Sequence, residues 1–422
     1  MAAPHPRHSA KEESMSTLND EQHALDEALE EYVRETNSRV GEVKPVPVKR
    51  TEHHEYTLAY RHVTEDLIRM FTVANGDTNP LWRDGNYATG SPWGGIVAPP
   101  LYFYTAAATT ALPEPPRIAG FDLFHGGSRV RMHRPIRHGD TLSAQDVWNG
   151  VENRSRPGRP HRTLLFNGER RFYNQDDELV AALHTRIIGT ARLPGTKTQG
   201  PKIGPDREIR PYSDTELKEV QDHYDDELAG KLRRGSQPRY WEDVREGDDL
   251  GTVLKGPLDI LDLATFTGVV GAGIAHADKW EMIRTELSRS PRDPQTRALH
   301  YQMDWHLFDA SAQAVGMPRA INFGAYMDIN ATHLVNNWLG DHGWFLEFDS
   351  RVGAPMFVGD LLRISGKVVR AYEEHGRGLV ELALTGTVRD DIEVTAVRAI
   401  VQLPHRGFPD EVVHQVLSDV GA

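Results

Sequence analysis

An internal repeat with a long period is the feature that most constrains the fold of this chain. The pattern Arg-(x)3-Pro-(x)3-Gly-Asp-x-Leu begins at Arg131 and begins again at Arg351. Upstream of each copy, Asp66-Leu-Ile-Arg-Met-Phe-Thr has a counterpart in Asp262-Leu-Ala-Thr-Phe-Thr, which is one residue shorter. Ordered matches of this kind predict two copies of one structural unit in tandem.

A third motif lies between these landmarks in each copy. In the first copy it spans residues 77–100 and begins Asp-Thr-Asn-Pro-Leu-Trp, and in the second it spans residues 301–324 and begins Tyr-Gln-Met-Asp-Trp-His. Trp82 and His306 hold equivalent positions, since each is followed by an Ala six residues later. The two copies therefore differ in the residues that are able to carry chemistry.

The first of these motifs resembles the hydratase motif of MaoC-like hot-dog proteins, which reads Gly-Asp-x-Asn-Pro-Leu/Ile-His with Ala or Ser six residues after the His. In that family the Asp and the His activate the water that adds to an enoyl thioester. By this resemblance the first copy keeps Asp77 and Asn79 but has Trp82 at the His position, whereas the second copy keeps His306.

The resemblance covers about residues 45–190 and 238–404 and implies an α+β, double hot-dog fold. In such a fold, two tandem repeats wrap one antiparallel sheet around central helices. The chain is most similar to tandem forms with a fatty-acid-synthase-like dehydratase N-terminal repeat. We expect the central helices at residues 65–75 and 261–270, side by side, with a continuous sheet joining both repeats.

Segments rich in β-forming residues follow each Gly-Asp and predict the strands. The predicted strands are Leu164–Tyr173, Leu179–Ile188, Leu361–Val369, Leu379–Val388 and Val394–Leu403. We divide the chain into a disordered N-terminus (1–18), an N-terminal repeat with a leader helix (19–192), a linker and helix (193–237), a C-terminal repeat (238–404) and a tail (405–422).

An acidic helix is expected before each repeat. Asn19 and Ser213 are suitable N-cap residues, each with Gln or Glu three positions later. Residues 193–205 are rich in Gly and Pro, which is typical of a linker. The second copy also carries about 28 extra residues, Gly273 to His300, before its motif. We expect this insertion to form a lid or rim beside His306, with a remote surface excursion as the alternative.

His306 is the leading catalytic candidate. A hydratase needs a group that takes a proton from water and returns one to the α-carbon, and imidazole suits both steps. Asp304, Tyr301 and Asp309 compete as its partner. Asp304 could orient the ring or share the water, and Tyr301 holds the Asp position of the family motif. Asp304 could instead only cap the following helix.

Gly324 is the expected oxyanion donor. A helix that begins near Gly324 would direct a backbone N–H at the thioester oxygen. Pro100 is its counterpart in the first copy and has no N–H. The first copy therefore lacks both the His and this donor, so we expect the working site in the C-terminal repeat. Asp77 and Asn79 then cap turns and bind backbone amides, or Asp77 acts with an unrecognised partner.

Two groups of residues are candidates for substrate binding. Arginine binds phosphates well, and coenzyme A carries them. The candidates for phosphate binding are Arg154, Arg156 and Arg159, which otherwise form a solvated hairpin turn. The candidates for the wall of an acyl pocket are Phe323, Tyr326 and Trp338, which otherwise belong to the core.

Composition narrows the range of partners. The formal net charge of −13 argues against nucleic acid, and the sequence contains no cysteine, which excludes disulfides and cysteine-ligated zinc. We expect no metal, no cofactor apart from the coenzyme A portion of a substrate, and no membrane segment, because no apolar run approaches about 18 residues. A cytoplasmic location and a homodimer of double hot-dogs fit this composition.

The resemblance implies a lyase of fatty acid metabolism that hydrates a 2-enoyl-CoA, or dehydrates a 3-hydroxyacyl-CoA, reversibly. Its substrate would be an acyl-CoA or an acyl-carrier thioester. Two alternatives remain on the same fold. One is an acyl-CoA thioesterase, and the other is a non-catalytic acyl-CoA-binding partner subunit.

Overall fold

The computed structural model describes most of the chain. The described residues are 6–46, 59–107, 113, 116, 118, 121–194, 207–270, 292, 295–299, 305–314 and 317–418, with side chains from residue 19 onward. Tyr301, Asp304 and nearly all of the insertion Gly273 to His300 lie outside this part, so the expectations that concern them stay predictions.

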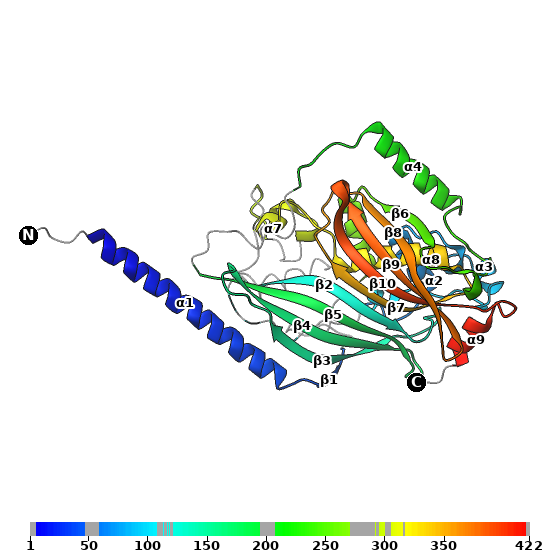
Figure 1. The fold of residues 1–422 in the computed structure, drawn as a ribbon, viewed down its shortest axis with the longest axis horizontal. Helices are drawn as coiled ribbons and strands as arrows, with labels where there is room; N and C mark the ends of the chain where they lie inside the picture. Colours follow the sequence, from blue (N-terminus) through cyan, green and yellow to red (C-terminus); the bar gives the residue numbers. More distant parts are fainter. Residues whose placement is uncertain are drawn as a thin grey trace, which may run out of the picture.

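The described strands form one antiparallel sheet of ten strands, as expected for a double hot-dog (Figure 1). The strands are β1 (Val43–Pro45), β2 (Phe121–Met132), β3 (Ser143–Asn153), β4 (His161–Tyr173), β5 (Leu179–Arg192), β6 (Asp249–Lys255), β7 (Trp344–Val352), β8 (Leu362–Glu374), β9 (Arg377–Val388) and β10 (Ile392–Leu403). Their order is β1-β3-β4-β5-β2-β7-β10-β9-β8-β6. The second half repeats the first in reverse, which is the order that a two-fold axis between β2 and β7 produces.

The pairing of β2 with β7 joins the two repeats around this axis. Arg131 and Arg351 are 220 residues apart in the sequence, and so are Arg129 and Asp349. Arg129 lies directly opposite Asp349 in the ladder. Equivalent residues therefore face each other, which is the arrangement of an isologous interface. The predicted pseudo-dimer with a continuous sheet is confirmed.

The helix at the centre of the fold is α8 (Gly324–Leu339), and every residue from Tyr326 to Leu339 is buried. The expected central helices are present as α2 (Glu65–Asn75) and α5 (Ile260–Val269) and pack side by side. They are not fully enclosed, however, because residues such as Met70 and Leu261 are exposed. Helix α8, by contrast, is buried all round from Tyr326 to Leu339.

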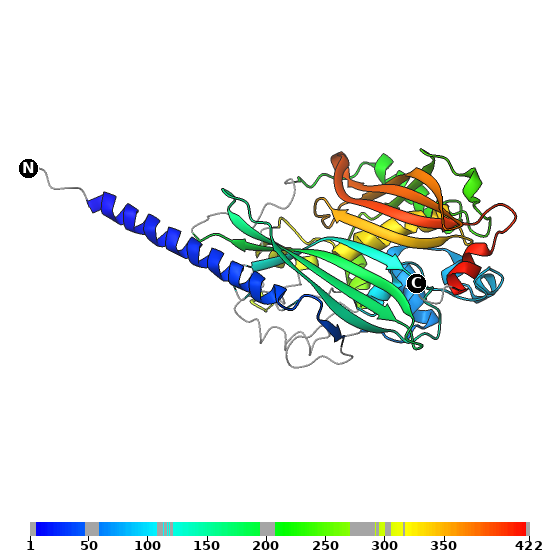
Figure 2. The ribbon, with the colours of Figure 1, turned by 60° about the horizontal axis from the view of Figure 1, so that its bottom comes forward.

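Two leader helices precede the repeats (Figures 1 and 2). Helix α1 (Pro6–Asn37) begins before Asn19, so Asn19 lies inside the helix and residues 6–18, expected to be disordered, are helical. Helix α4 (Asp214–Leu228) begins as predicted, since Ser213 and Glu216 form a reciprocal capping box. Figures 1 and 2 show α1 extending away from the sheet at its N-terminal end.

Short helices complete the described part of the fold. They are η1 (Pro80–Trp82), α3 (Gly85–Thr89), η2 (Tyr102–Thr105), η3 (Trp241–Asp243), α7 (Asp309–Ala314), η5 (Arg389–Asp391) and α9 (Glu411–Ser418). The segment η2 follows Pro100 at the place where α8 follows its own motif. Within the described residues, no helix has the length and apolar character needed to cross a membrane.

Candidate functional site

His306 is fixed by its backbone neighbours and by an aromatic ring. Its Nδ1 lies 2.9 Å from the carbonyl oxygen of Ile321. Its ring stacks on Phe323, with the ring centroids 3.7 Å apart. Burial lowers the pKa of the His306 imidazole to about 4, although bonds to the backbone of Ile321 and Asn322 raise it. The ring is therefore neutral at pH 7, with Nδ1–H donating to Ile321 and a lone pair on Nε2.

Gly324 is the first residue of α8, as the sequence predicted. The N-cap residue, Phe323, makes no side-chain cap hydrogen bond. The amides at the start of α8 therefore receive no capping side chain, and the helix dipole adds partial positive charge there. A Cβ atom at residue 324 would overlap the ring of His125, so the position requires glycine.

The N-terminal repeat contributes residues to this same place. Phe124 of β2 stacks on Trp305, with centroids 5.8 Å apart and planes 15° apart. His125, the next residue of β2, packs on Gly324. Neither residue belongs to the repeated motifs, and sequence reasoning missed both. Only the pairing of β2 with β7 brings them to the start of α8.

Asp77 and Asn79 lie at a different place and hold a turn together. Oδ1 of Asp77 accepts from the amide of Asn79 at 2.9 Å, and Oδ1 of Asn79 accepts from the amide of Leu81 at 3.0 Å. Nε1 of Trp82 donates to Oδ2 of Asp77 at 3.1 Å. Trp82 therefore occupies the position of the family His and binds the Asp. This geometry favours the structural role for Asp77 and Asn79.

Three residues from other elements complete a buried ionic network around Asp77. Lys255 of β6 donates from Nζ to Nδ1 of His333 at 2.7 Å. His333 of α8 lies 3.2 Å from Oε1 of Glu227, at the end of α4, and 3.9 Å from Oδ1 of Asp77. If Lys255 donates to Nδ1, then Nε2 of His333 carries the hydrogen and donates to Glu227. No motif in the sequence indicated this network.

The charges of this network depend on each other. Burial lowers the pKa of Lys255 to about 8, against the opposite effect of Glu227 and Asp77. Burial raises the pKa of Glu227, but hydrogen bonds from His333 and Thr78 and the charge of Lys255 outweigh it, so the pKa lies well below its usual value. At pH 7 the lysine is charged and both carboxylates have hydrogen-bond donors.

Asp77, Glu227 and His333 also have the composition of a metal site, since their ligand atoms all lie within 4.8 Å of one another. The ammonium group of Lys255 already supplies a positive charge next to His333. We therefore interpret the cluster as an ion-pair network that joins the first motif, the linker helix and α8.

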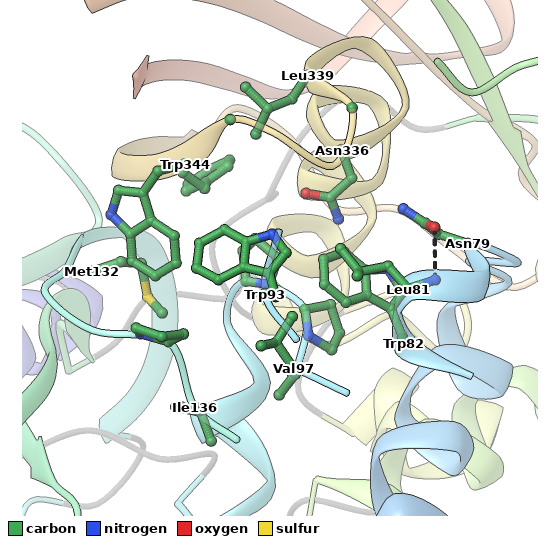
Figure 3. A pocket seen from close by; sticks show the side chains of 17 residues that line it. Asn79, Leu81, Trp82, Trp93, Val97, Met132, Ile136, Asn336, Leu339 and Trp344 are labelled. Carbon is green, nitrogen blue, oxygen red and sulfur yellow. Dashed lines mark hydrogen bonds between the residues drawn. The ribbon is translucent and has the colours of Figure 1, made fainter. Parts of the chain in front are cut away.

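An apolar pocket lies beside this network (Figure 3). Its volume is about 40 Å³, enough for a few water molecules. The ring of Trp82 lies at one end and that of Trp344 at the other, with Trp93 between them (Figure 3). Pro100 lines it too. A pocket of this size does not admit an acyl chain in the form that the structure shows.

The remaining predicted residues are dispersed. Oδ1 of Asp309 accepts from the amide of Ala320 at 2.8 Å, so it holds a loop rather than His306. Tyr326 packs edge-on against Phe266, and Trp338 lies under the guanidinium of Arg239. These two predicted pocket residues belong to the core. The predicted phosphate ligands Arg154, Arg156 and Arg159 are exposed in the turn between β3 and β4.

A second cavity, of about 570 Å³, is lined by four arginines: Arg207, Arg210, Arg319 and Arg389. Arg207 and Arg319 both lie over the ring of Phe357, at 4.7 and 5.4 Å from its centroid. Nη2 of Arg207 pairs with Asp360, whereas its buried Nε and Nη1 have no hydrogen-bond partner among the described residues. Phe357 forms a β-bridge with Ile321, which binds His306. Phe357 and Ile321 therefore link the lining arginines to His306 through successive contacts.

The N-terminal repeat is similar in sequence to known proteins. A family model described as the FAS1-like, dehydratase domain region matches residues 52–183. The UPF0336 protein Franean1_6066 of Parafrankia sp. (strain EAN1pec) is 34% identical over 136 residues, which are 31% of this chain and 86% of that protein. The UPF0336 protein SCO4636 of Streptomyces coelicolor is 26% identical over 134 residues, which are 31% of this chain and 85% of that protein.

Comparison with solved structures covers both repeats. A MaoC-like dehydratase superposes with a TM-score of 0.57 at 20% identity, over 88% of this chain and 99% of that one. Rv0216 of Mycobacterium tuberculosis, described as having a double hotdog fold, superposes with a TM-score of 0.51 at 17% identity, over 86% and 96% of the two chains. The fold is the double hot-dog of MaoC-like dehydratases.

Among the double hot-dog proteins, the sequence comparison also identifies a particular family. This chain belongs to the UPF0336 family, and its N-terminal repeat is a FAS1-like dehydratase region.

The ionic network leads to a prediction about stability. Replacing Lys255 with Met should lower the free energy of unfolding by about 3–5 kcal/mol, because Asp77 and Glu227 would remain buried without their cation. Urea unfolding followed by circular dichroism measures the loss. Lys231→Met is the matched control, since Lys231 pairs with Asp226 on the surface, and it should change stability little. Equal effects of the two substitutions would contradict the network.

Proposed function

We propose that this protein hydrates a 2-enoyl thioester, and dehydrates a 3-hydroxyacyl thioester in reverse, at the C-terminal repeat. The observation that carries the proposal is the position of His306. Its neutral ring stacks on Phe323, the residue immediately before the glycine that begins α8. A proton acceptor and an uncapped helix start thus lie side by side in one site.

Each group has a role in the hydration step. Nε2 of His306 takes a proton from water as the water oxygen bonds to the β-carbon. The π electrons of the double bond move toward the carbonyl, and the amide of Gly324 donates to the resulting enolate oxygen. A proton then bonds to the α-carbon. Dehydration follows the same path in reverse. Asp304 and Tyr301 stay candidates for the partner of His306.

The arginine cavity supports coenzyme A as the carrier of the acyl group. The guanidinium group of one arginine donates two parallel hydrogen bonds to the oxygen atoms of a phosphate. Arg207 has two buried nitrogen atoms without described partners, and Phe357 connects its cavity to His306 through Ile321. We therefore propose Arg207 and Arg319 as phosphate ligands, in addition to the exposed Arg154, Arg156 and Arg159.

A direct assay separates this function from its alternatives. The protein is mixed with crotonyl-CoA, and both the enoyl absorbance and the release of free thiol are followed. Loss of enoyl absorbance without thiol release is expected. Thiol release would indicate a thioesterase, and binding without either change would indicate a non-catalytic subunit.

Removal of His306 tests the assignment of the working repeat. His306→Ala should lower kcat by about 10²–10⁴, the usual effect of losing a general acid–base group. Because burial lowers the pKa of His306 to about 4, the wild-type rate should fall only as the pH drops toward 4, not near 6.5. Circular dichroism checks that the variant folds. An active His306→Ala together with an inactive Asp77→Ala would place the site in the N-terminal repeat.

A pair of substitutions at Gly324 isolates its amide. Ala and Pro both add a Cβ atom that disturbs His125, but only Pro removes the N–H. Proline is tolerated at the first position of a helix, so folding should survive. Gly324→Pro should therefore be slower than Gly324→Ala by about 10²–10³ in kcat, the usual contribution of one oxyanion donor. Equal rates would exclude the amide as the donor.

Truncated substrates test the phosphate ligands. Arg207→Gln and Arg319→Gln should raise KM for crotonyl-CoA with little change in kcat, because the phosphates lie away from the reacting carbons. The same variants should leave KM unchanged for the crotonyl thioester of N-acetylcysteamine, which has no phosphate. Arg154→Gln provides the comparison at the exposed turn. If only Arg154→Gln raises KM, the phosphates bind at the turn between β3 and β4.

A further inference from the structure

His125 is aimed at the start of α8 by an irregularity in its strand. The register between β2 and β5 shifts between His125 and Gly127, which marks a β-bulge. Gly127 has φ of +137°, and a Cβ atom there would overlap the carbonyl of Ser350 in β7. Bulges of this kind redirect a side chain and are frequent beside active sites. Here the bulge places the imidazole against Gly324.

Polar groups from both repeats hold the ring of His125. Its Nε2 lies 3.2 Å from Oγ of Ser128 and 3.6 Å from Oδ2 of Asp328 in α8. The hydroxyl of Tyr104 lies 3.1 Å from the same Oγ and 3.4 Å from the same Oδ2. The position of Asp328 suits it to stabilise an imidazolium at His125.

The carboxylate of Asp328 has spare hydrogen-bonding capacity. Its side chain is 1% exposed, and Oδ1 has no partner among the described residues. A buried carboxylate without full hydrogen bonding is costly unless a cation faces it. Within the described residues, His125 is the group that lies within ion-pair distance of Asp328, and the contact becomes an ion pair when the imidazole is protonated. The side chain of His125 is 19% exposed, so it remains accessible to a substrate.

Each of the two histidines contacts a residue at the helix start. His306 stacks on Phe323, and His125 packs on the next residue, Gly324. The residues before the histidines, Trp305 and Phe124, stack on each other. The site thus offers two imidazoles around one oxyanion donor. Hydration likewise has two proton transfers, one from water and one to the α-carbon.

We propose that His125 is a catalytic residue that the N-terminal repeat supplies to the His306 site, where it gives the proton to the α-carbon in hydration. This inference rests on the proposed function. His306 takes a proton from water, the water oxygen bonds to the β-carbon, and the enolate forms. The His125 imidazolium then loses its proton to the α-carbon. The proton gained by His306 balances the proton lost by His125, and exchange with solvent restores both rings.

Asp328 is a positioning residue for His125 in this scheme. Its carboxylate orients the ring through Nε2, while Ser128 and Tyr104 complete the arrangement. In this scheme the N-terminal repeat takes part in catalysis, although its own motif has Trp82 at the position of the His. The two repeats would form one site between them.

The test compares His125→Gln, His125→Ala and Asp328→Asn in the full chain, with crotonyl-CoA as substrate. His125→Gln should lower kcat by about 10²–10⁴ with little change in KM. Added imidazole should restore part of the rate of His125→Ala, which a structural role would not produce. His184→Gln, on the adjacent strand β5, is the matched control and should keep wild-type kinetics. Thermal unfolding of every variant is measured alongside.

The outcomes separate this inference from the proposed function. A wild-type protein that does not hydrate the substrate would refute the proposed function itself. A hydrating wild type whose His125→Gln variant keeps its kcat would overturn the role of His125 alone. A loss of rate that imidazole does not restore would also overturn it, because the ring would then act only in packing. Rescue together with an unchanged KM and unfolding temperature supports the proposal.

Discussion

Burial of the polar helix α8 is the constraint on which the rest of the structure depends. All residues from Tyr326 to Leu339 are buried, and they include Asp328, His333 and two adjacent asparagines. Buried polar groups must find hydrogen-bond partners inside the protein. The sheet cannot provide them all, since its own backbone groups are occupied by strand pairing. Side chains from the other repeat and from the linker therefore have to meet this helix.

The hydrogen-bond partners of α8 come from both repeats and from the linker helix α4. At its start, α8 meets His125 and Tyr104 of the N-terminal repeat, and in its middle His333 meets Glu227 and Lys255. Asn336, one turn further along, donates to Asp77 at 3.4 Å. Removing one partner of such a network leaves a buried group unsatisfied, which costs more than the net value of the bond. The repeats are therefore joined by polar contacts as well as by the sheet.

The same helix explains why the two motifs differ. The second motif leads directly into α8, so His306 lies beside a helix start that has no side-chain cap. The first motif leads through Pro100 into the short turn η2, which lacks an equivalent start. Trp82 fills the space of the missing His and binds Asp77. The first motif thus holds a turn through Asp77 and Asn79, and the second places a neutral imidazole beside the start of α8.

Local patterns in the sequence were sufficient for much of the fold. The repeat predicted the tandem arrangement, enrichment in β-forming residues predicted five strands within a few residues, and the capping box predicted the start of α4. Spacing also predicted the helix start at Gly324. The resemblance to hot-dog proteins assigned the central position to residues 65–75 and 261–270. The central position of α8 was not predicted, because its many polar residues are typical of a surface helix.

The sequence by itself determined the tandem repeat, the Trp at the His position of the first motif and the place of Gly324, because motifs and their spacing are properties of neighbouring residues. The resemblance of these motifs to MaoC-like proteins then implied the double hot-dog fold. The tertiary structure alone decided which side chains meet. His125 and Asp328 are 203 positions apart in the chain, and Asp77 and His333 are 256 apart. Their contacts arise from the pairing of β2 with β7 and from the burial of α8, and no local pattern records them.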